Sequence, residues 1–102
     1  MESPEPAVHI ERLNWDDWNR EHINKHTVSP EEVEEVLAGL PLVGRSKSKP
    51  DRIVVIGPTV AGRVLFIAMG PDPQEPGVWY PFSARPAHRV ERRIYRETIQ
   101  DR

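Results

Sequence analysis

Two histidines four residues apart are the first feature of the sequence that could do chemistry. His22 and His26 lie in the segment NWDDWNREHINKHTV, residues 14–28, and on a helix this spacing puts both imidazoles on one face. Such a pair could chelate zinc or transfer protons, and Lys25 beside them could reach a phosphate. Zinc needs at least a third ligand, and the chain has neither a cysteine nor an HExxH motif.

The residues around the histidines favour a packed helix face. The expected helix would place Trp15, Trp18 and Asn19 on the same side as both imidazoles. In that interpretation the tryptophans fill the core and His22 satisfies a buried polar partner. His26, at the helix end, keeps the alternative of acting as a general acid or base beside a bound anion. Packing, catalysis and metal binding therefore stay open for this pair.

A second set of candidates combines two arginines with one glutamate. Arg63 precedes one apolar run and Arg85 ends another, and a guanidinium group binds phosphate through two parallel hydrogen bonds. Glu91 is the acidic position on the apolar side of the last predicted helix. Burial there would raise its pKa toward that of a general base, unless an arginine keeps it ionised. Metal-free RNA cleavage needs such cations with a base and an acid, but the alternative is a Glu91–Arg85 ion pair that fixes the helix to the sheet.

The charge distribution suggests an anionic partner. The chain has 102 residues and a net charge of −2, yet residues 1–41 contain ten acidic and three basic residues, whereas residues 42–102 contain six acidic and eleven basic residues. Either the basic half meets nucleic acid or the two halves neutralise each other. The arginines predicted to follow an RNA backbone are Arg45, Arg52, Arg89 and Arg92. A plain solvated surface is the alternative.

Periodicity and capping signals predict the elements that position these residues. Helices are expected over 15–26, with Asn14 as N-cap, and from Pro30 to about Gly39, with Ser29 as N-cap and Glu32 closing a capping box. Strands are expected at 9–13, 42–49, 52–57, 63–69 and 78–85, with a bulge or sheet edge at Pro81, and a last helix at 87–100. This order predicts an α+β fold with two N-terminal helices, an antiparallel sheet of three to four strands and a C-terminal helix.

Composition bears on compartment and domain number. The absence of cysteine excludes disulfides and thiolate metal sites, and it fits a reducing compartment. No segment is apolar enough to span a membrane, and the N-terminus lacks the pattern of a signal peptide. We therefore expect a cytoplasmic protein with a flexible leader at 1–8 and a single domain at 9–102.

Three stretches together resemble the BrnT family of type II toxins. They are WD…N…HI.KH.VS..E at 15–32, GRVLF at 62–66 and SARPA…ER..Y at 83–95, and the resemblance spans about residues 13–96. It implies a RelE-like fold and a single BrnT-like toxin domain. It further implies a bacterial endoribonuclease that cleaves RNA without metal or cofactor, inhibits translation and arrests growth. The implied partners are RNA and a DNA-binding, BrnA-like antitoxin, with a toxin–antitoxin hetero-oligomer as the possible assembly.

The resemblance carries site residues over only where the motifs match. The matching candidates for catalysis are His26, Arg63, Arg85, Glu91 and Tyr95, and Lys25 joins the four arginines named above as a candidate for binding RNA phosphates. Tyr95 could equally be a core residue with its hydroxyl at the rim. Two positions depart from the family: Thr27 replaces a glycine, and His88 replaces a threonine or similar small residue. A β-branched residue with positive φ is costly, so we expect a re-shaped turn at Thr27 and a different helix start at His88.

Two other functions fit the same residues. A non-catalytic module of the same fold could bind a protein partner or nucleic acid, and a zinc-dependent enzyme could use His22 and His26. The toxin hypothesis predicts a chelator-resistant activity that Arg85→Ala removes. A binding module has no catalytic activity, and the activity of a zinc enzyme would be abolished by chelators.

Overall fold

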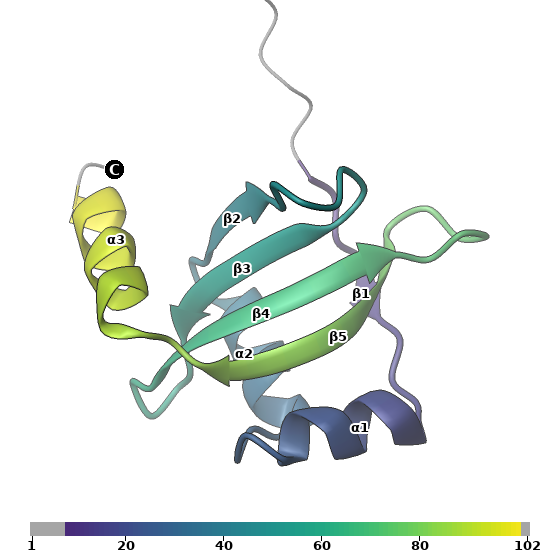
Figure 1. The fold of residues 1–102 in the computed structure, drawn as a ribbon, viewed down its shortest axis with the longest axis horizontal. Coiled ribbons are helices and arrows are strands. Elements are labelled where there is room, and N and C mark those ends of the chain that lie inside the picture. The colour runs from purple at the N-terminus through teal and green to yellow at the C-terminus, as the bar shows by residue number, and fades with distance from the viewer. Residues whose placement is uncertain (1–7, 101–102) are drawn as a thin grey trace, which may run out of the picture.

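Residues 8–100, which the computed structural model describes, form three helices and one five-stranded sheet (Figure 1). In chain order the elements are β1 (Arg12–Leu13), α1 (Asp17–Asn24), α2 (Pro30–Ala38), β2 (Leu42–Arg45), β3 (Ile53–Pro58), β4 (Val64–Pro71), β5 (Val78–Pro86) and α3 (Arg89–Gln100). The strand order across the sheet is β1-β5-β4-β3-β2. The predicted leader lies outside the described residues apart from Val8.

The α+β class and the order of the helices confirm the prediction, but the sheet is mixed. β1 runs parallel to β5 through the pairs Arg12↔Val78 and Leu13↔Trp79, whereas the other neighbouring strands are antiparallel. A strand was expected at 9–13, but the predicted antiparallel sheet of three to four strands did not include its parallel pairing with β5. β1 has only two residues, which is too short for alternation to reveal a partner or a direction.

Capping residues set where the two N-terminal helices begin. α2 starts as predicted, at a reciprocal capping box between Ser29 and Glu32. α1 starts later than predicted, because its N-cap is Asp16 and not Asn14. The Asp16 carboxylate accepts the Asn19 N–H at 2.9 Å, and Asn19 Oδ1 accepts the Asp16 N–H at 2.9 Å. The carbonyl of Asn14 instead accepts a hydrogen bond from the Asn19 side chain.

The N-cap aspartate also ties α1 to β5. The Tyr80 hydroxyl lies 2.8 and 2.9 Å from the two carboxylate oxygens of Asp16 and donates to them. Hydrogen bonds from the Asn19 N–H and then from Tyr80 lower the pKa of Asp16. Burial and the hydrogen bond to Asp16 raise the pKa of Tyr80 to about 12. The phenol and the carboxylate therefore keep this contact at neutral pH.

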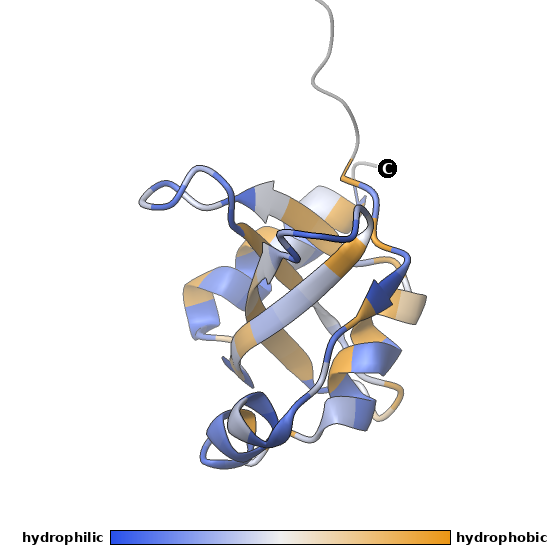
Figure 2. Cartoon of the chain, turned by 90° about the vertical axis from the view of Figure 1, so that its right-hand side faces the viewer, coloured by the Kyte–Doolittle hydropathy of each residue, from blue (hydrophilic) through white to orange (hydrophobic). Residues whose placement is uncertain are grey.

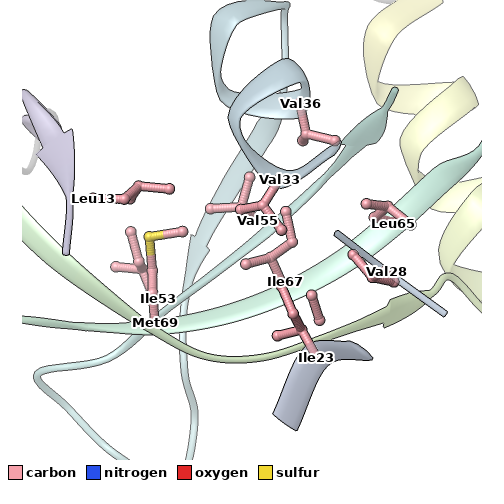
Figure 3. Packing of buried hydrophobic residues seen from close by; sticks show 11 residues of the cluster. Leu13, Ile23, Val28, Val33, Val36, Ile53, Val55, Leu65, Ile67 and Met69 are labelled. Carbon is pink, nitrogen blue, oxygen red and sulfur yellow. The ribbon is translucent and has the colours of Figure 1, made fainter. Parts of the chain in front are cut away.

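The hydrophobic core lies between one face of the sheet and helices α1 and α2. Alternate residues of β3 and β4 point into it, and Figure 2 shows hydrophobic residues concentrated in the central strands. Members shown in Figure 3 include Ile23, Val28, Val33, Val36, Ile53, Val55, Leu65, Ile67 and Met69. The other face of the sheet, called here the open face, carries neither α1 nor α2, and α3 stands at one end of the sheet beside β2 and β3 (Figure 1).

One tryptophan of the first helix segment is not where the sequence analysis placed it. Trp15 is half-buried against the core, but Trp18 is 57% exposed and stacks on His22 with ring centroids 4.8 Å apart. The buried residues of α1 are Asn19 and Ile23. The expectation that Trp18 fills the core was wrong, because a two-turn helix that begins at Asp17 turns a narrower face to the sheet than the expected longer helix.

The predicted irregularity at Pro81 is confirmed as a bulge between β4 and β5. The pairing register skips Phe82, which is therefore the extra residue on β5. The Phe82 ring lies beside Gly70, where a Cβ would come within 2.7 Å of a ring carbon. The Arg52 guanidinium carbon lies 4.2 Å from the centre of the same ring. The bulge thus places an aromatic ring under a basic side chain.

The turn after α1 keeps a left-handed residue despite the threonine. Thr27 has a φ of 59°, and its N–H bonds to the carbonyl of Asn24 at 3.0 Å. The N–H of Val28 bonds to the carbonyl of Ile23 at 3.3 Å, which completes the Schellman pattern of a helix end. The expected re-shaping of this turn was wrong. Ile23 and Val28 are both buried, and their packing holds the turn in a form that favours glycine.

Thr27→Gly should therefore stabilise the protein. Glycine reaches a positive φ without the clash of a Cβ, so we expect the free energy of unfolding to rise by about 1 kcal/mol in urea denaturation. Thr27→Ala loses the hydroxyl but keeps the Cβ, and as the matched control it should bring no gain. A Thr27→Gly protein no more stable than Thr27→Ala would contradict the strain assigned to this turn.

Candidate functional site

Arg85 lies on the open face of the sheet. Cross-strand pairing aligns it with Phe66 on β4, and Phe66 with Ile56 on β3 and Leu42 on β2. Residues paired across strands share a face, and Leu65 beside Phe66 points to the core, so this row faces away from α1 and α2. The Arg85 guanidinium carbon lies 4.3 Å from the centre of the Phe66 ring, and the side chain is 28% exposed. The guanidinium group thus packs on an aromatic ring and remains accessible to solvent.

A bidentate ion pair with Glu91 orients this guanidinium. Arg85 Nη1 and Nη2 donate to Glu91 Oε1 and Oε2 at 2.8 and 2.9 Å. Glu91 Oε1 also accepts the backbone N–H of His88 at 2.7 Å, which is the position before α3. One carboxylate therefore caps α3 and holds Arg85. A helix start at His88 that differs from that of the BrnT family stays a prediction.

The ion pair decides the protonation of Glu91. Hydrogen bonds from Arg85, outweighing the effect of burial, lower the pKa of Glu91, and the N–H of His88 adds to this. The hydrogen bonds to Glu91 raise the pKa of Arg85. The sequence left two alternatives open for Glu91, a base with a pKa raised by burial and an ion pair with Arg85, and the geometry contains the ion pair. Glu91 is an ionised partner that positions Arg85.

Tyr95 attaches α3 to the segment before β2. Its hydroxyl donates to the carbonyl of Leu40 at 3.1 Å, and its ring is half-buried. It follows Glu91 by one helical turn, so the two side chains lie on the same side of α3. The hydroxyl is thus at the rim of the packing, as one of the two sequence-based interpretations expected.

Arg63 lies on the other side of the sheet from Arg85. Its Nη2 donates to Glu32 Oε1 and Oε2 at 2.9 and 3.0 Å and to the carbonyl of Thr27 at 2.8 Å. Glu32 belongs to α2 and Thr27 to the turn after α1, and both helices cover the core face. The two arginines that the sequence analysis grouped in one site are therefore separated by the sheet, and Arg63 clamps the turn between the helices.

Lys25 and His26 are exposed at the end of α1, on the side of Arg63. His26 meets His22 edge to face, with ring centroids 6.4 Å apart.

Within residues 8–100, no three His, Asp or Glu side chains gather closely enough to hold a metal ion, so the zinc hypothesis lacks its third ligand there. No hydrogen bond or ion pair among the described residues joins Lys25 or His26 to Arg85 or Glu91.

The four arginines predicted to bind RNA are distributed over two regions. Arg45 ends β2, where it pairs with Ile53, and Arg52 lies over Phe82 on the open face. Arg89 and Arg92 belong to α3, where Arg92 also donates to the carbonyl of Ala87 at 2.7 Å. The acidic helices α1 and α2 lie on the opposite side of the sheet from the first region. Part of the charge asymmetry of the sequence is therefore a difference between the two faces of the sheet.

Phe66 and Phe82 are functional candidates that the sequence analysis missed. Each ring lies under a guanidinium group, from Arg85 and Arg52 respectively. Local periodicity could not reveal these contacts. They depend on the register of β4 against β5 and on the bulge at Phe82.

No family model and no curated protein matches the sequence. The structure is similar to the 1.1 Å crystal structure of the Brucella abortus ribonuclease toxin BrnT, with a TM-score of 0.59 over 76% of this chain and 97% of that chain. The fold is BrnT-like. The aligned residues are 22% identical, so the comparison establishes the fold predicted from the sequence motifs and leaves the chemistry to the geometry above. Among the described residues, no helix is long and apolar enough to cross a bilayer.

Glu91→Gln should reduce stability in a pH-dependent way. The folded protein holds the pKa of Glu91 below its usual 4.5, so the ionised pair contributes fully above that pH and is lost as the pH falls through the folded value. We expect Glu91→Gln to lower the free energy of unfolding by about 1–2 kcal/mol at pH 7, and the deficit to shrink below pH ~4.5.

Urea denaturation at several pH values measures this difference, and Glu97→Gln on the same helix is the matched control, because Glu97 has only a 3.8 Å contact with Arg93. A Glu91→Gln deficit that grows on acidification would have the wrong sign for the assigned pair.

Arg63→Met should destabilise the fold whatever its effect on activity. The variant removes the hydrogen bonds to Glu32 and Thr27, and we expect a loss of about 1–3 kcal/mol in the free energy of unfolding. Arg20→Met, on the exposed side of α1, should cost less than about 0.5 kcal/mol. Equal stability of the two variants would show that the Arg63 clamp contributes little.

Proposed function

We propose that this protein is an endoribonuclease toxin that cleaves RNA without a metal ion, with Arg85 on the open face as the phosphate-binding residue. The observation that carries the proposal is the Arg85 guanidinium itself, which is oriented by Glu91, supported by the Phe66 ring and accessible to solvent. The BrnT-like fold supports the same reaction class, since the similar structure is that of a ribonuclease toxin.

The arginine keeps donors for a substrate phosphate while it is paired. A guanidinium has five N–H donors, and the contacts to Glu91 and the Pro86 carbonyl use three. In the proposed reaction the RNA 2′-oxygen attacks the adjacent phosphorus, the bond to the 5′-oxygen breaks, and a cyclic phosphate forms. The remaining donors stabilise the negative charge on the non-bridging oxygens in the transition state.

Proton transfer requires a base for the 2′-hydroxyl and an acid for the leaving 5′-oxygen. Glu91, as the ionised partner of Arg85, fits a positioning role better than either of these. His88 Nδ1 lies 3.9 Å from Glu91 Oε1, and its side chain is 71% exposed, so this imidazole borders the phosphate site. We assign proton transfer at this phosphate to His88. The predicted His26 lies on the Arg63 side of the sheet, and the hydroxyl of the predicted Tyr95 donates to the Leu40 carbonyl, so both fit this role less well.

The biological setting that we propose follows from the similarity of the fold to that of a ribonuclease toxin. The proposed toxin acts in the bacterial cytoplasm, inhibits translation by RNA cleavage, and is neutralised by a DNA-binding, BrnA-like antitoxin in a hetero-oligomer. α3 offers a surface for such a partner, because Val90 and Ile94 are 60% and 45% exposed and Arg89, Arg93 and Arg96 lie around them. An acidic, partly apolar segment would complement this surface.

Arg85→Ala should abolish RNA cleavage and leave the protein folded. The test incubates purified protein with total RNA in the presence of EDTA, first alone and then with ribosomes, and follows the fragments on gels. Removal of one preorganised charge donor typically costs about 10²–10³ in rate. Arg20→Ala, on the acidic helix side, is the control and should cleave like the wild type, with circular dichroism confirming that both variants are folded.

Cleavage by wild type and Arg85→Ala at equal rates would contradict the site. Loss of wild-type activity in EDTA would contradict metal independence. No cleavage by any folded protein, with or without ribosomes, would favour a non-catalytic binding module.

A further inference from the structure

A hollow of about 310 Å³ lies on the open face beside Arg85. Its floor is apolar and includes Val54 and Ile56 of β3 and the ring of Phe66. Phe66 also supports the Arg85 guanidinium, so the hollow and the phosphate-binding residue share one aromatic side chain. Its volume is at the lower end of the ~300–1,000 Å³ typical of small-molecule sites. The hollow therefore has room for a single ring system.

The rim of the hollow is cationic. Lys47, which follows β2, supplies this charge, and none of the residues around the hollow is acidic. An apolar floor with a basic rim is complementary to a group that is flat and uncharged itself but attached to a polyanion. A nucleobase on a sugar-phosphate strand has this combination of properties.

We propose that this hollow binds one unstacked base of a single-stranded RNA and sets the position of the strand relative to Arg85. The inference rests on the proposed ribonuclease function and adds to it a base-binding subsite outside the reacting phosphate. The base contacts Phe66 and the aliphatic side chains of β3, while the adjoining phosphates meet Arg85 on one side and Lys47 on the other. Sheet faces that carry exposed aromatic residues bind unstacked bases in this way in other RNA-binding folds.

Gly44 makes the hollow possible and provides the means to test it. It lies on β2 opposite Val54, and a Cβ added there would meet no atom within 4 Å. A large side chain at this position would therefore extend into free space in the hollow without displacing the protein. Its neighbour Val43 pairs with Val55 and so points to the other face of the same strand. Gly44→Phe would fill the hollow. Val43→Phe adds the same ring on the other face of β2, where it cannot fill the hollow.

The experiment measures binding separately from cleavage. The probe is a fluorescein-labelled 2′-O-methyl RNA of about ten nucleotides, within the range of known single-strand sites, and the missing 2′-hydroxyl prevents its cleavage. Fluorescence anisotropy at low salt gives the affinity of the wild type, Gly44→Phe and Val43→Phe. We expect Gly44→Phe to bind roughly tenfold or more weakly, the order expected when one stacked base is lost, and Val43→Phe to stay within about twofold of the wild type. A second strand with abasic central residues should bind the wild type about tenfold more weakly than the full strand, whereas Gly44→Phe should barely distinguish the two strands.

Equal affinity of Gly44→Phe and the wild type, with both folded by circular dichroism, would overturn the base site and leave the hollow to an apolar side chain of a protein partner. Equal binding of full and abasic strands by the wild type would overturn it as well, because only charge would then hold the strand. RNA cleavage by the wild type in parallel shows whether the ribonuclease proposal survives either result. A wild type that discriminates the strands but cleaves no RNA would support the base site and contradict the nuclease.

Discussion

The alternation of side chains along β3, β4 and β5 is the constraint on which the other features depend. Successive residues of a strand point to opposite faces, so burying Val55, Leu65 and Ile67 under α1 and α2 forces Ile56, Phe66 and Arg85 to the open face. A shift of one residue in the register of β5 would exchange these faces. The chemistry on the open face is thus a direct consequence of how the core is built.

The same constraint separates the charges of the molecule. The acidic residues of α1 and α2 lie on the core side of the sheet, and the cations Lys47, Arg52 and Arg85 lie around the open face. Arg63, a cation on the helix side, pairs with Glu32. A net charge of −2 therefore conceals one face that is suited to a polyanion.

Polar contacts, not burial, attach α3 to the sheet. None of the residues of this helix is fully buried, and the bonds that fix it are the Arg85–Glu91 pair, Tyr95 to the Leu40 carbonyl, and Arg92 to the Ala87 carbonyl. Glu91 contributes to both the helix cap and the orientation of Arg85, so the phosphate site and the docking of α3 are physically linked. A segment held by few apolar contacts is also among the parts of a fold that open most readily.

Much of the fold could be predicted from local sequence, but only part of the site. The Ser29 capping box, the bulge at Pro81 and the buried strands follow from short-range signals that the structure retains. The parallel strand β1, the exposure of Trp18 and the separation of Arg63 from Arg85 depend on tertiary packing and strand register, which periodicity does not contain.

The protonation of Glu91 likewise required the position of its partner. Its spacing from Arg85 left a buried base and an ion pair equally open, and only the side-chain geometry separates the two. Phe66 and Phe82 became candidates only when the guanidinium groups above them were located.

The most direct test of this account is to map which face of the sheet touches RNA. A short 2′-O-methyl strand carrying 4-thiouridine would be photo-crosslinked to the protein, and the modified peptides identified by mass spectrometry. The account predicts crosslinks in peptides from β2, β3 and β4 that contain Val54, Ile56 or Phe66. Crosslinks confined to α1, around Trp18 and His22, would contradict it and move the RNA site to the helix side of the sheet.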